Sequence, residues 1–298
     1  MKTRVLVTGS TGFVGSHVLK FLRENQFYII GIGRKECSDS IKYCDEYYSI
    51  DITKPFYKQF KVDLCIHIAG LANDKADYKS LYNVNVIGLQ NLLDSTKNCK
   101  KIIFISSSSV YNNSETIHNE DENIDIDLLL PYGKSKRLAE LKLIENSKNF
   151  ENVTILRPRA IYGVGDTTLL PRILKLIFGK IIFLPANKKT ITSLTAISNL
   201  LYAIYLTINS DMNGIKIYNV ADNCRYNLND VIYKVGNKFR PRLKKFYVFN
   251  LINLLSAIFN KKRLAIQYLK YDCILDLNKI NRELNYNPNS NLDDFIIE

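Results

Sequence analysis

The stretch that decides the fold is RVLVTGSTGFVG, Arg4 to Gly15. It begins with a short apolar run typical of a buried strand, and Gly9, Gly12 and Gly15 follow where a helix would open. Glycines at such a turn let the backbone approach a pyrophosphate, and the first helical turn offers amide donors and a partial positive charge. The stretch therefore predicts a phosphate-binding turn that opens a βαβ unit.

Strand-like and helix-like segments alternate over the first half of the chain. The expected strands are residues 4–8, 28–32, a short one ending near 51, 63–68, 101–106 and 153–157, and the expected helices are 14–25, 81–97 and 131–146. This alternation predicts an α/β protein with a doubly wound parallel sheet. We expect residues 1–157 to form a Rossmann domain whose sheet is completed by later segments. Residues 158–298, with apolar helices and short strands, should form mainly a smaller substrate-binding lobe.

A second informative stretch is Tyr132-Gly133-Lys134-Ser135-Lys136, inside a predicted helix. Residues four apart share a helix face, so the side chains of Tyr132 and Lys136 should lie together. A neighbouring ammonium favours the phenolate of a tyrosine, whose pKa is ordinarily about 10, and so suits it to proton exchange near neutral pH. This chemistry is what the interconversion of an alcohol and a ketone requires.

The GxxGxxG spacing and the Tyr132-x-x-x-Lys136 pair resemble the extended short-chain dehydrogenase/reductases. The resemblance is to the nucleotide-sugar epimerase and dehydratase branch and to the related 3β-hydroxysteroid-dehydrogenase-like branch. It covers essentially the whole chain and implies a nicotinamide cofactor. The cofactor-binding residues that it implies, apart from Arg34, are Gly9, Thr11, Gly12, Phe13, Val14, Gly15, Asp51, Ile52, Ala69, Gly70, Leu71, Asn85, Tyr132 and Lys136.

The resemblance also implies catalytic roles. Tyr132 would be the general acid/base, and Lys136 would lower its pKa and hydrogen-bond the nicotinamide ribose. Ser107, in the run Ser106 to Ser109, would orient the substrate oxygen, and Asn85 would steady the site. In the 4,6-dehydratases of this family an acidic pair follows the catalytic threonine, whereas this chain has serines there. Dehydration is therefore not expected, which leaves reduction, oxidation or epimerisation through a transient ketone.

The end of the second expected strand bears on the choice of cofactor. Family members that use NAD typically carry an acidic residue there, which accepts hydrogen bonds from the ribose. This chain has Gly33, followed by Arg34-Lys35. An arginine can hold a 2′-phosphate through two donors, so NADP(H) is the preferred prediction. Glu36 is close enough in sequence to leave NAD(H) open.

The substrate is less well defined than the reaction. Nucleotide-sugar enzymes of the family often have asparagine at the position of Ala160 and arginine near Thr192, and this chain has neither. Lys188, Lys189 or the basic stretch 234–270 could take over the role of that arginine. The leading prediction is chemistry at C4 of a nucleotide-activated sugar. A reductase of a lipophilic, steroid-like ketone and a non-catalytic dinucleotide-binding sensor are the alternatives, although a sensor would not need Tyr132, Lys136 and Ser107.

The net charge is +12, and the stretch from Lys234 to Lys270 contains ten basic residues and no acidic one. Such a stretch attracts phosphates of a substrate, a nucleic acid or an anionic membrane, unless it is simply a solvated face. The chain lacks an aromatic-basic repeat, so no nucleic-acid partner is expected. We predict that the apolar run Phe246 to Phe259 is a core or lid helix. It is too short to span a bilayer, which allows at most peripheral membrane contact.

The remaining features predict an ordinary cytoplasmic protein. No segment reads as a signal peptide, and the six cysteines form no CxxC pair, so reduced thiols are expected. His17 is expected in the first helix and His118 in a polar loop without ligand partners, and neither is given a role. No metal site is predicted. The family resemblance implies a homodimer built on the helix that carries Tyr132 and the one before it.

Overall fold

The computed structural model describes residues 2–73, 76–96, 98–113, 115–186, 189–249 and 270–297. The chain divides into two compact units. The first comprises Met1–Val110, Pro131–Arg157 and Leu201–Tyr218, and the second comprises Tyr111–Leu130, Pro158–Leu200 and Asn219–Glu298. The division therefore does not fall at a single point in the sequence. The assignment of the two units to cofactor and substrate stays a prediction.

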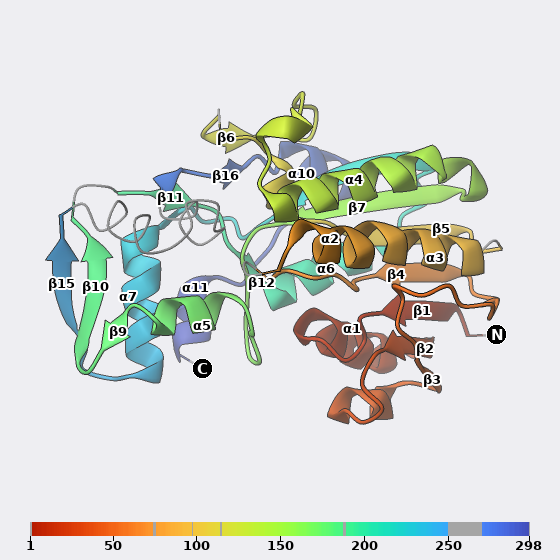
Figure 1. Ribbon diagram of the computed structural model, residues 1–298, viewed down its shortest axis with the longest axis horizontal. Helices are drawn as coiled ribbons and strands as arrows, with labels where there is room; N and C mark the ends of the chain where they lie inside the picture. Colours follow the sequence, from red (N-terminus) through yellow and green to blue (C-terminus); the bar gives the residue numbers. More distant parts are fainter. Residues whose placement is uncertain are drawn as a thin grey trace. The chain divides into compact units, whose positions relative to one another are not determined.

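The first unit is built on a seven-stranded sheet with the order β13-β7-β5-β4-β1-β2-β3 (Figure 1). Its strands are β1 (Arg4–Thr8), β2 (Tyr28–Gly33), β3 (Glu46–Ser49), β4 (Leu64–His67), β5 (Lys101–Ile105), β7 (Asn152–Pro158) and β13 (Gly214–Val220), which continues into the second unit. The pairs from β3 through to β7 are all parallel. The order reverses at β1, and doubly wound sheets bind nucleotides at such a point. The predicted fold class is confirmed.

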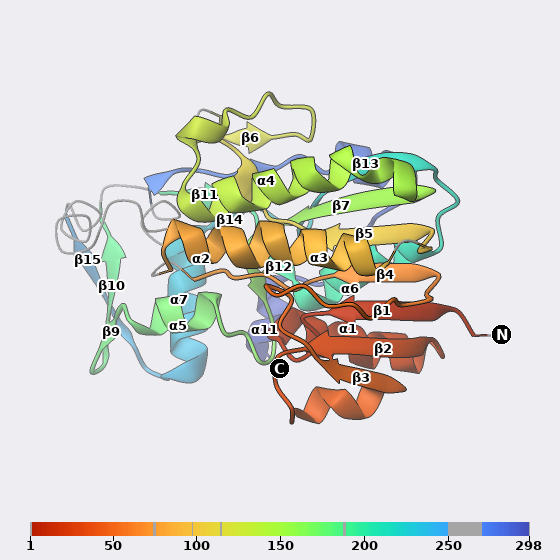
Figure 2. The same cartoon turned by 45° about the vertical axis from the view of Figure 1, so that its right-hand side comes forward.

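Helices cover both faces of this sheet (Figure 2). They are α1 (Phe13–Glu24), α2 (Tyr78–Tyr82), α3 (Gly88–Ser95), α4 (Pro131–Glu145) and α6 (Ile197–Ile208), with short 3-10 turns η1 (Asp39–Tyr43), η3 (Ser108–Val110) and η5 (Ser147–Asn149). Side chains of α3 and α4, such as Leu92 and Leu143, share one core cluster with Leu6 of β1 and Phe104 of β5. On the other face, α1 and α6 meet through the rings of Phe21 and Tyr205.

The predicted helix 81–97 differs from the structure. The helix begins earlier, at Tyr78, and is interrupted by the π-helical turn η2 (Asn83–Ile87) before α3 ends at Ser95. A π-helical turn adds one residue to the helix and changes which side chains face inward, and such turns are frequent at functional sites. Asn85 lies in this turn and is only 1% exposed.

The second unit consists of short helices and small sheets. Its helices are α5 (Leu169–Leu174), α7 (Leu228–Phe239), α10 (Asn278–Leu284), α11 (Leu292–Ile297) and the 3-10 turn η4 (Ile126–Leu128). Its strands are β6 (Ile117–His118), β8 (Ile161–Tyr162), β9 (Ile177–Phe178), β10 (Ile181–Pro185), β11 (Ile191–Thr192), β12 (Thr195–Ala196), β14 (Tyr226–Asn227), β15 (Lys244–Val248) and β16 (Ile274–Leu275). The strands β15, β10 and β9 form a three-stranded sheet, and the other strands pair in twos.

The prediction of a helix over Phe246 to Phe259 is wrong at its beginning. Lys244–Val248 forms β15, which pairs in parallel with β10. Aromatic and β-branched side chains fit a pleated surface, and the neighbouring strand β10 supplies the backbone partners that a local reading of hydrophobicity does not show. Residues 250–259 of the predicted helix lie outside the described residues.

A buried histidine links the two strands at the centre of the sheet. Thr8 Oγ1 of β1 lies 2.7 Å from His67 Nδ1 of β4, and the ring of His67 stacks on Phe104. His67 is fully buried, and this burial, helped by the charge of Lys136, lowers its pKa from 6.5 to about 3. The ring therefore stays neutral in the folded protein at any ordinary pH.

Glu140 of α4 is the centre of a buried ion-pair network. Its carboxylate accepts hydrogen bonds from Ser106 Oγ (2.6 Å), from Arg157 Nε and Nη2 (2.9 and 2.8 Å) and from Arg137 Nη1 (2.9 Å). Burial opposes the charge of Glu140, but the guanidinium of Arg157 and these hydrogen bonds hold the pKa below its usual value. The network fastens α4 to β7 and to the residue that follows β5.

We expect Glu140→Gln to lower the free energy of unfolding by about 3–5 kcal/mol, because it leaves Arg157 buried without its counter-charge. Urea unfolding measures this loss. The matched control is Glu145→Gln on the same helix, where an exposed ion pair with Lys142 should be worth less than about 1 kcal/mol. Equal effects of the two variants would contradict the role of the buried network.

We also expect His67→Gln to reduce the sensitivity of stability to acid. The folded pKa of His67 lies below that of the unfolded chain, so its contribution is complete above the unfolded value and is lost as the pH falls. Between about pH 7.5 and about pH 5 the wild type should lose about 2 kcal/mol more than the variant. Urea unfolding at both pH values measures the difference, and an unchanged difference would mean that another group is responsible.

Candidate active site

The glycine turn after β1 closes tightly on itself. Gly9 has a φ of +68°, which L side chains rarely adopt, and the amide of Gly12 donates to its carbonyl at 3.0 Å. A Cβ atom on Gly15 would lie 2.1 Å from the carbonyl oxygen of Gly9. No larger residue fits at these positions without moving the turn. Close backbone approaches thus explain Gly9 and Gly15, and a Cβ on Gly12 would have a tight contact of 3.3 Å with the Gly9 carbonyl oxygen.

The helix that follows is suited to an anion. α1 begins after Gly12, which has no side-chain cap, and its first turn contains no acidic residue. The first amides of a helix lack intrahelical partners, so those near Phe13 and Val14 are donors for a ligand. The backbone cradle at Gly9, Gly12 and Gly15 therefore fits the pyrophosphate of a dinucleotide.

The ends of β2 and β3 lie beside this turn. A Cβ atom on Gly33 would lie 2.8 Å from the Tyr47 hydroxyl and 2.9 Å from Thr11 Oγ1, so an acidic side chain here would have to displace Tyr47. Arg34 follows and is exposed. Hydrogen bonds from Thr53 lower the pKa of the Asp51 carboxyl most, and the nearby Arg34 guanidinium lowers it further. The predicted residues Thr11, Arg34 and Asp51 are therefore neighbours.

The loop after β4 is held by Asn85. The Asn85 side chain accepts a hydrogen bond from the amide of Leu71 at 2.8 Å and donates to Ser135 Oγ of α4 at 2.8 Å. The amide of Ala69 donates to Thr8 Oγ1, which ties the loop to the glycine turn. Ile52 packs against Gly88 of α3, and a Cβ atom on Gly88 would lie 2.7 Å from the Ile52 side chain. Asn85 thus joins the loop after β4 to α4.

Lys136 is buried where these elements meet. Its ammonium donates to the carbonyl of Ile105 at 2.7 Å and lies 4.4 Å from the centre of the Phe104 ring. A Cβ on Gly70 would lie 3.6 Å from this ammonium. Burial lowers the pKa of Lys136 to about 8, and the Glu140 carboxylate opposes that shift. The group is thus a desolvated cation at the carboxyl end of the sheet.

The first turn of α4 lies against the serine run. A Cβ on Gly133 would lie only 1.9 Å from the carbonyl oxygen of Ser109. Ser107 is 8% exposed, and its hydroxyl donates to Ser109 Oγ at 3.1 Å. The glycine after Tyr132 therefore allows the start of α4 to meet the serines. Tyr132 itself is half-buried.

The predicted site residues form two neighbouring groups at one edge of the sheet. Thr11, Arg34 and Asp51 lie at the ends of β1 to β3, whereas Gly70, Asn85 and Lys136 converge near the ends of β4 and β5. Sequence reasoning did not find Glu140 or Ser135. A signal for Glu140 was present, because residue 140 is four positions after Lys136 and shares its helix face.

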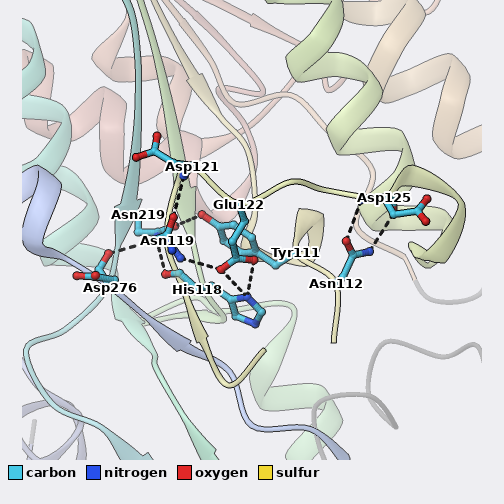
Figure 3. A network of polar contacts seen from close by, with 9 residues as sticks. All are labelled: Tyr111, Asn112, His118, Asn119, Asp121, Glu122, Asp125, Asn219 and Asp276. Atoms are coloured by element: carbon cyan, nitrogen blue, oxygen red, sulfur yellow. Dashed lines mark hydrogen bonds and ion pairs between the residues drawn. The ribbon is translucent and has the colours of Figure 1, made fainter. Parts of the chain in front are cut away.

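The second unit contains a polar network around His118 (Figure 3). The imidazole of His118 contacts the Glu122 carboxylate at 3.1 Å and stacks on Tyr111, whose hydroxyl donates to Asn219 Oδ1 at 2.6 Å. Asn219 Nδ2 in turn donates to the carbonyl of His118. The expectation of a polar loop is thus wrong, because His118 lies in β6 and is 2% exposed. It acts here as a structural residue of this unit.

The positions that depart from the nucleotide-sugar pattern also lie in the second unit. Ala160 has a φ of +42°, a left-handed conformation that asparagine tolerates better than alanine. Thr192 Oγ1 accepts a hydrogen bond from Arg159 Nε at 2.8 Å. Arg159 is 5% exposed. Of the predicted replacements for the arginine near Thr192, Lys188 lies outside the described residues and Lys189 is exposed.

No helix in the described ranges is long and apolar enough to cross a membrane. Nor does any group of three or more histidine, cysteine or carboxylate side chains there have the geometry of a metal site.

Comparison with known proteins identifies the family. The model of the NAD dependent epimerase/dehydratase family matches residues 5–221. The UDP-glucose 4-epimerase of Vibrio cholerae is 30% identical over 243 residues, which are 74% of this chain and 71% of that protein. The N-acetyl-alpha-D-glucosaminyl-diphospho-ditrans,octacis-undecaprenol 4-epimerase of Escherichia coli O157:H7 is 27% identical over 259 residues, 83% of this chain and 76% of that protein.

Solved structures share the fold. MoeE5 in complex with UDP-glucuronic acid and NAD superposes with a TM-score of 0.78 at 19% identity, over 99% of this chain and 96% of that one. UDP-glucuronic acid 4-epimerase from Bacillus cereus in complex with NAD gives a TM-score of 0.76 at 20% identity, over 99% and 94%. The resemblance seen in the motifs is thereby confirmed. The chain belongs to the NAD dependent epimerase/dehydratase family and is an enzyme of the extended short-chain dehydrogenase/reductase type.

Proposed function

We propose that the protein interconverts a secondary alcohol and a ketone at C4 of a nucleotide-activated sugar, with epimerisation as the net reaction. The observation that carries the proposal is the buried Lys136, held one turn after Tyr132 on a helix whose Gly133 contacts the serine run. Lys136 is thus the desolvated member of the proposed acid/base pair, and Tyr132 is half-buried. The C4 position is supported by the names of the relatives from Vibrio cholerae and Escherichia coli, both of which are 4-epimerases.

The proposed mechanism moves one proton at the substrate oxygen. When bound, the nicotinamide supplies and accepts the hydride. In the oxidative direction the Tyr132 oxygen takes the proton of the C4 hydroxyl, and in the reductive direction it returns a proton to the ketone oxygen. The nearby charge of Lys136 favours the phenolate form. Ser107 donates a hydrogen bond to the same substrate oxygen, and Asn85 fixes the loop at Leu71 against α4.

We further propose a preference for NADP(H). Gly33 leaves the end of β2 without a carboxylate, and Arg34 is the next residue, exposed and near Asp51. An acidic residue there would repel a 2′-phosphate, whereas a guanidinium binds one. The family description names NAD, so the proposed preference for NADP(H) departs from that description. The homodimer and the cytoplasmic location expected from the sequence stay predictions.

Tyr132→Phe should reduce kcat by about a hundredfold to ten-thousandfold, because it removes the proton-transferring hydroxyl and leaves the ring. Turnover of UDP-glucose and UDP-N-acetylglucosamine, followed by chromatography of the C4 epimers, measures this loss. Tyr57→Phe is the matched control, since Tyr57 is 95% exposed. Thermal stabilisation by the cofactor should survive in both variants. A Tyr132→Phe enzyme that turns over normally would overturn the mechanism.

Thermal stabilisation also tests whether the substrate is a nucleotide sugar. Uridine or thymidine diphosphate should raise the melting temperature of the cofactor-loaded protein, because a ligand that binds only the folded state stabilises it. If no nucleoside diphosphate shifts the melting temperature, the substrate is not a nucleotide sugar, and the lipophilic ketone becomes the substrate class to test.

Arg34→Ala should weaken NADPH binding by about 10- to 100-fold and leave NADH binding nearly unchanged, because charged hydrogen bonds to the 2′-phosphate are lost. Titration of both cofactors by fluorescence gives the two dissociation constants. Lys20→Ala on the exposed part of α1 controls for net charge. Equal losses for NADPH and NADH would show that Arg34 does not read the 2′-phosphate.

A further inference from the structure

The three-stranded sheet of the second unit has one packed face and one exposed face. Ile177, Ile182 and Leu184 point into the core cluster shared with α7. The contact is close, because a Cβ on Gly236 of α7 would lie 2.7 Å from the Ile182 side chain. Figure 1 shows β15, β10 and β9 beside α7. Successive residues of a strand face opposite sides, so the alternate residues of this sheet point away from α7.

The exposed face is apolar rather than polar. Phe178 pairs with Ile181, and Phe183 pairs with Phe246, so these four side chains lie on one face. Phe178 is 78% exposed, Phe246 is 54% exposed and Ile181 is 36% exposed. Phe249, just beyond β15, is 77% exposed. A sheet that covers a core on one side normally turns polar residues to water on the other. Contiguous exposed apolar side chains of this kind mark an interaction surface.

Basic residues border this apolar face. Lys244 pairs with Ile181 and therefore lies on the same face, and Lys180 occupies the turn between β9 and β10. Both are exposed. Carboxylates are absent from the sequence of both contributing segments, residues 167–210 and 231–271. Lysines on an edge strand also discourage strand pairing, but that function does not explain exposed phenylalanines or the absence of acidic residues.

We propose that this face, formed by Phe178, Ile181, Phe183, Lys244 and Phe246 and bordered by Lys180 in the turn, docks the protein on an anionic lipid surface. Aromatic rings would enter the interfacial region of the bilayer, while the lysine ammoniums contact lipid phosphates. A protein partner with an acidic surface would satisfy the lysines but would bury several phenylalanines only with matching apolar residues. A lipid surface offers both properties at once. The docking does not depend on the catalytic assignment.

Sedimentation with vesicles tests the docking. The full-length protein should bind vesicles of phosphatidylcholine and phosphatidylglycerol, bind phosphatidylcholine alone far more weakly, and be released by high salt. Lys244→Gln should lower the partition coefficient about fivefold. The double variant Phe178→Ser/Phe246→Thr should lower it further. Tyr57→Ser, which removes an exposed aromatic ring from the first unit, should bind as the wild type does.

The variants must be folded for this comparison, so their melting temperatures and their stabilisation by NADPH are measured in parallel. A wild type that stays in the supernatant with anionic vesicles would overturn the proposal. So would equal binding of the wild type and the Phe178→Ser/Phe246→Thr variant. Self-association that the double variant abolishes, without vesicle binding by either protein, would assign the face to a second copy of the chain instead.

Discussion

The carboxylate of Glu140 is the constraint on which the active-site arrangement depends. It is fully buried between Ser106, Arg137 and Arg157. If α4 slid or rotated, these groups would separate and leave unpaired charges in the low-dielectric interior. Lys136 lies about one helical turn before Glu140, and Tyr132 lies about two turns before Glu140. The positions of Tyr132 and Lys136, the proposed acid/base pair, are therefore set by the ion-pair network of Glu140.

The same carboxylate also stabilises the charged form of the buried Lys136 side chain. Desolvation alone would favour the neutral amine, and Glu140 shifts the pKa back upward so that it stays near 8. The carbonyl of Ile105 accepts a hydrogen bond from the ammonium. A lysine in this state keeps its charge near neutral pH, which the proposed role beside Tyr132 requires. The contacts that hold α4 in place therefore also set the charge state of Lys136 within the first unit.

The second unit departs from the pattern of nucleotide-sugar enzymes at Ala160 and Thr192, and it also carries the apolar and basic sheet face. At Ala160 and Thr192, nucleotide-sugar enzymes of the family often carry asparagine and arginine that contact the nucleotide diphosphate, and this chain lacks both. The sheet face is the surface proposed to dock on anionic lipid. Among the relatives, one acts on UDP-glucose and another on a sugar joined through a diphosphate to undecaprenol, by their names. The relatives are therefore named for sugars joined to different carriers.

The sequence by itself determined the local elements: the strand and glycine turn at Arg4 to Gly15, the sheet class, and the shared face of Tyr132 and Lys136. These follow from periodicities and backbone needs within a few residues. Only the tertiary structure decided the inward turn of Asn85, the contact of Gly133 with Ser109, the partners of Glu140 and the strand at Lys244–Val248. Each of these depends on residues distant in the sequence, and local propensity carries no information about which distant partner the folded chain will supply.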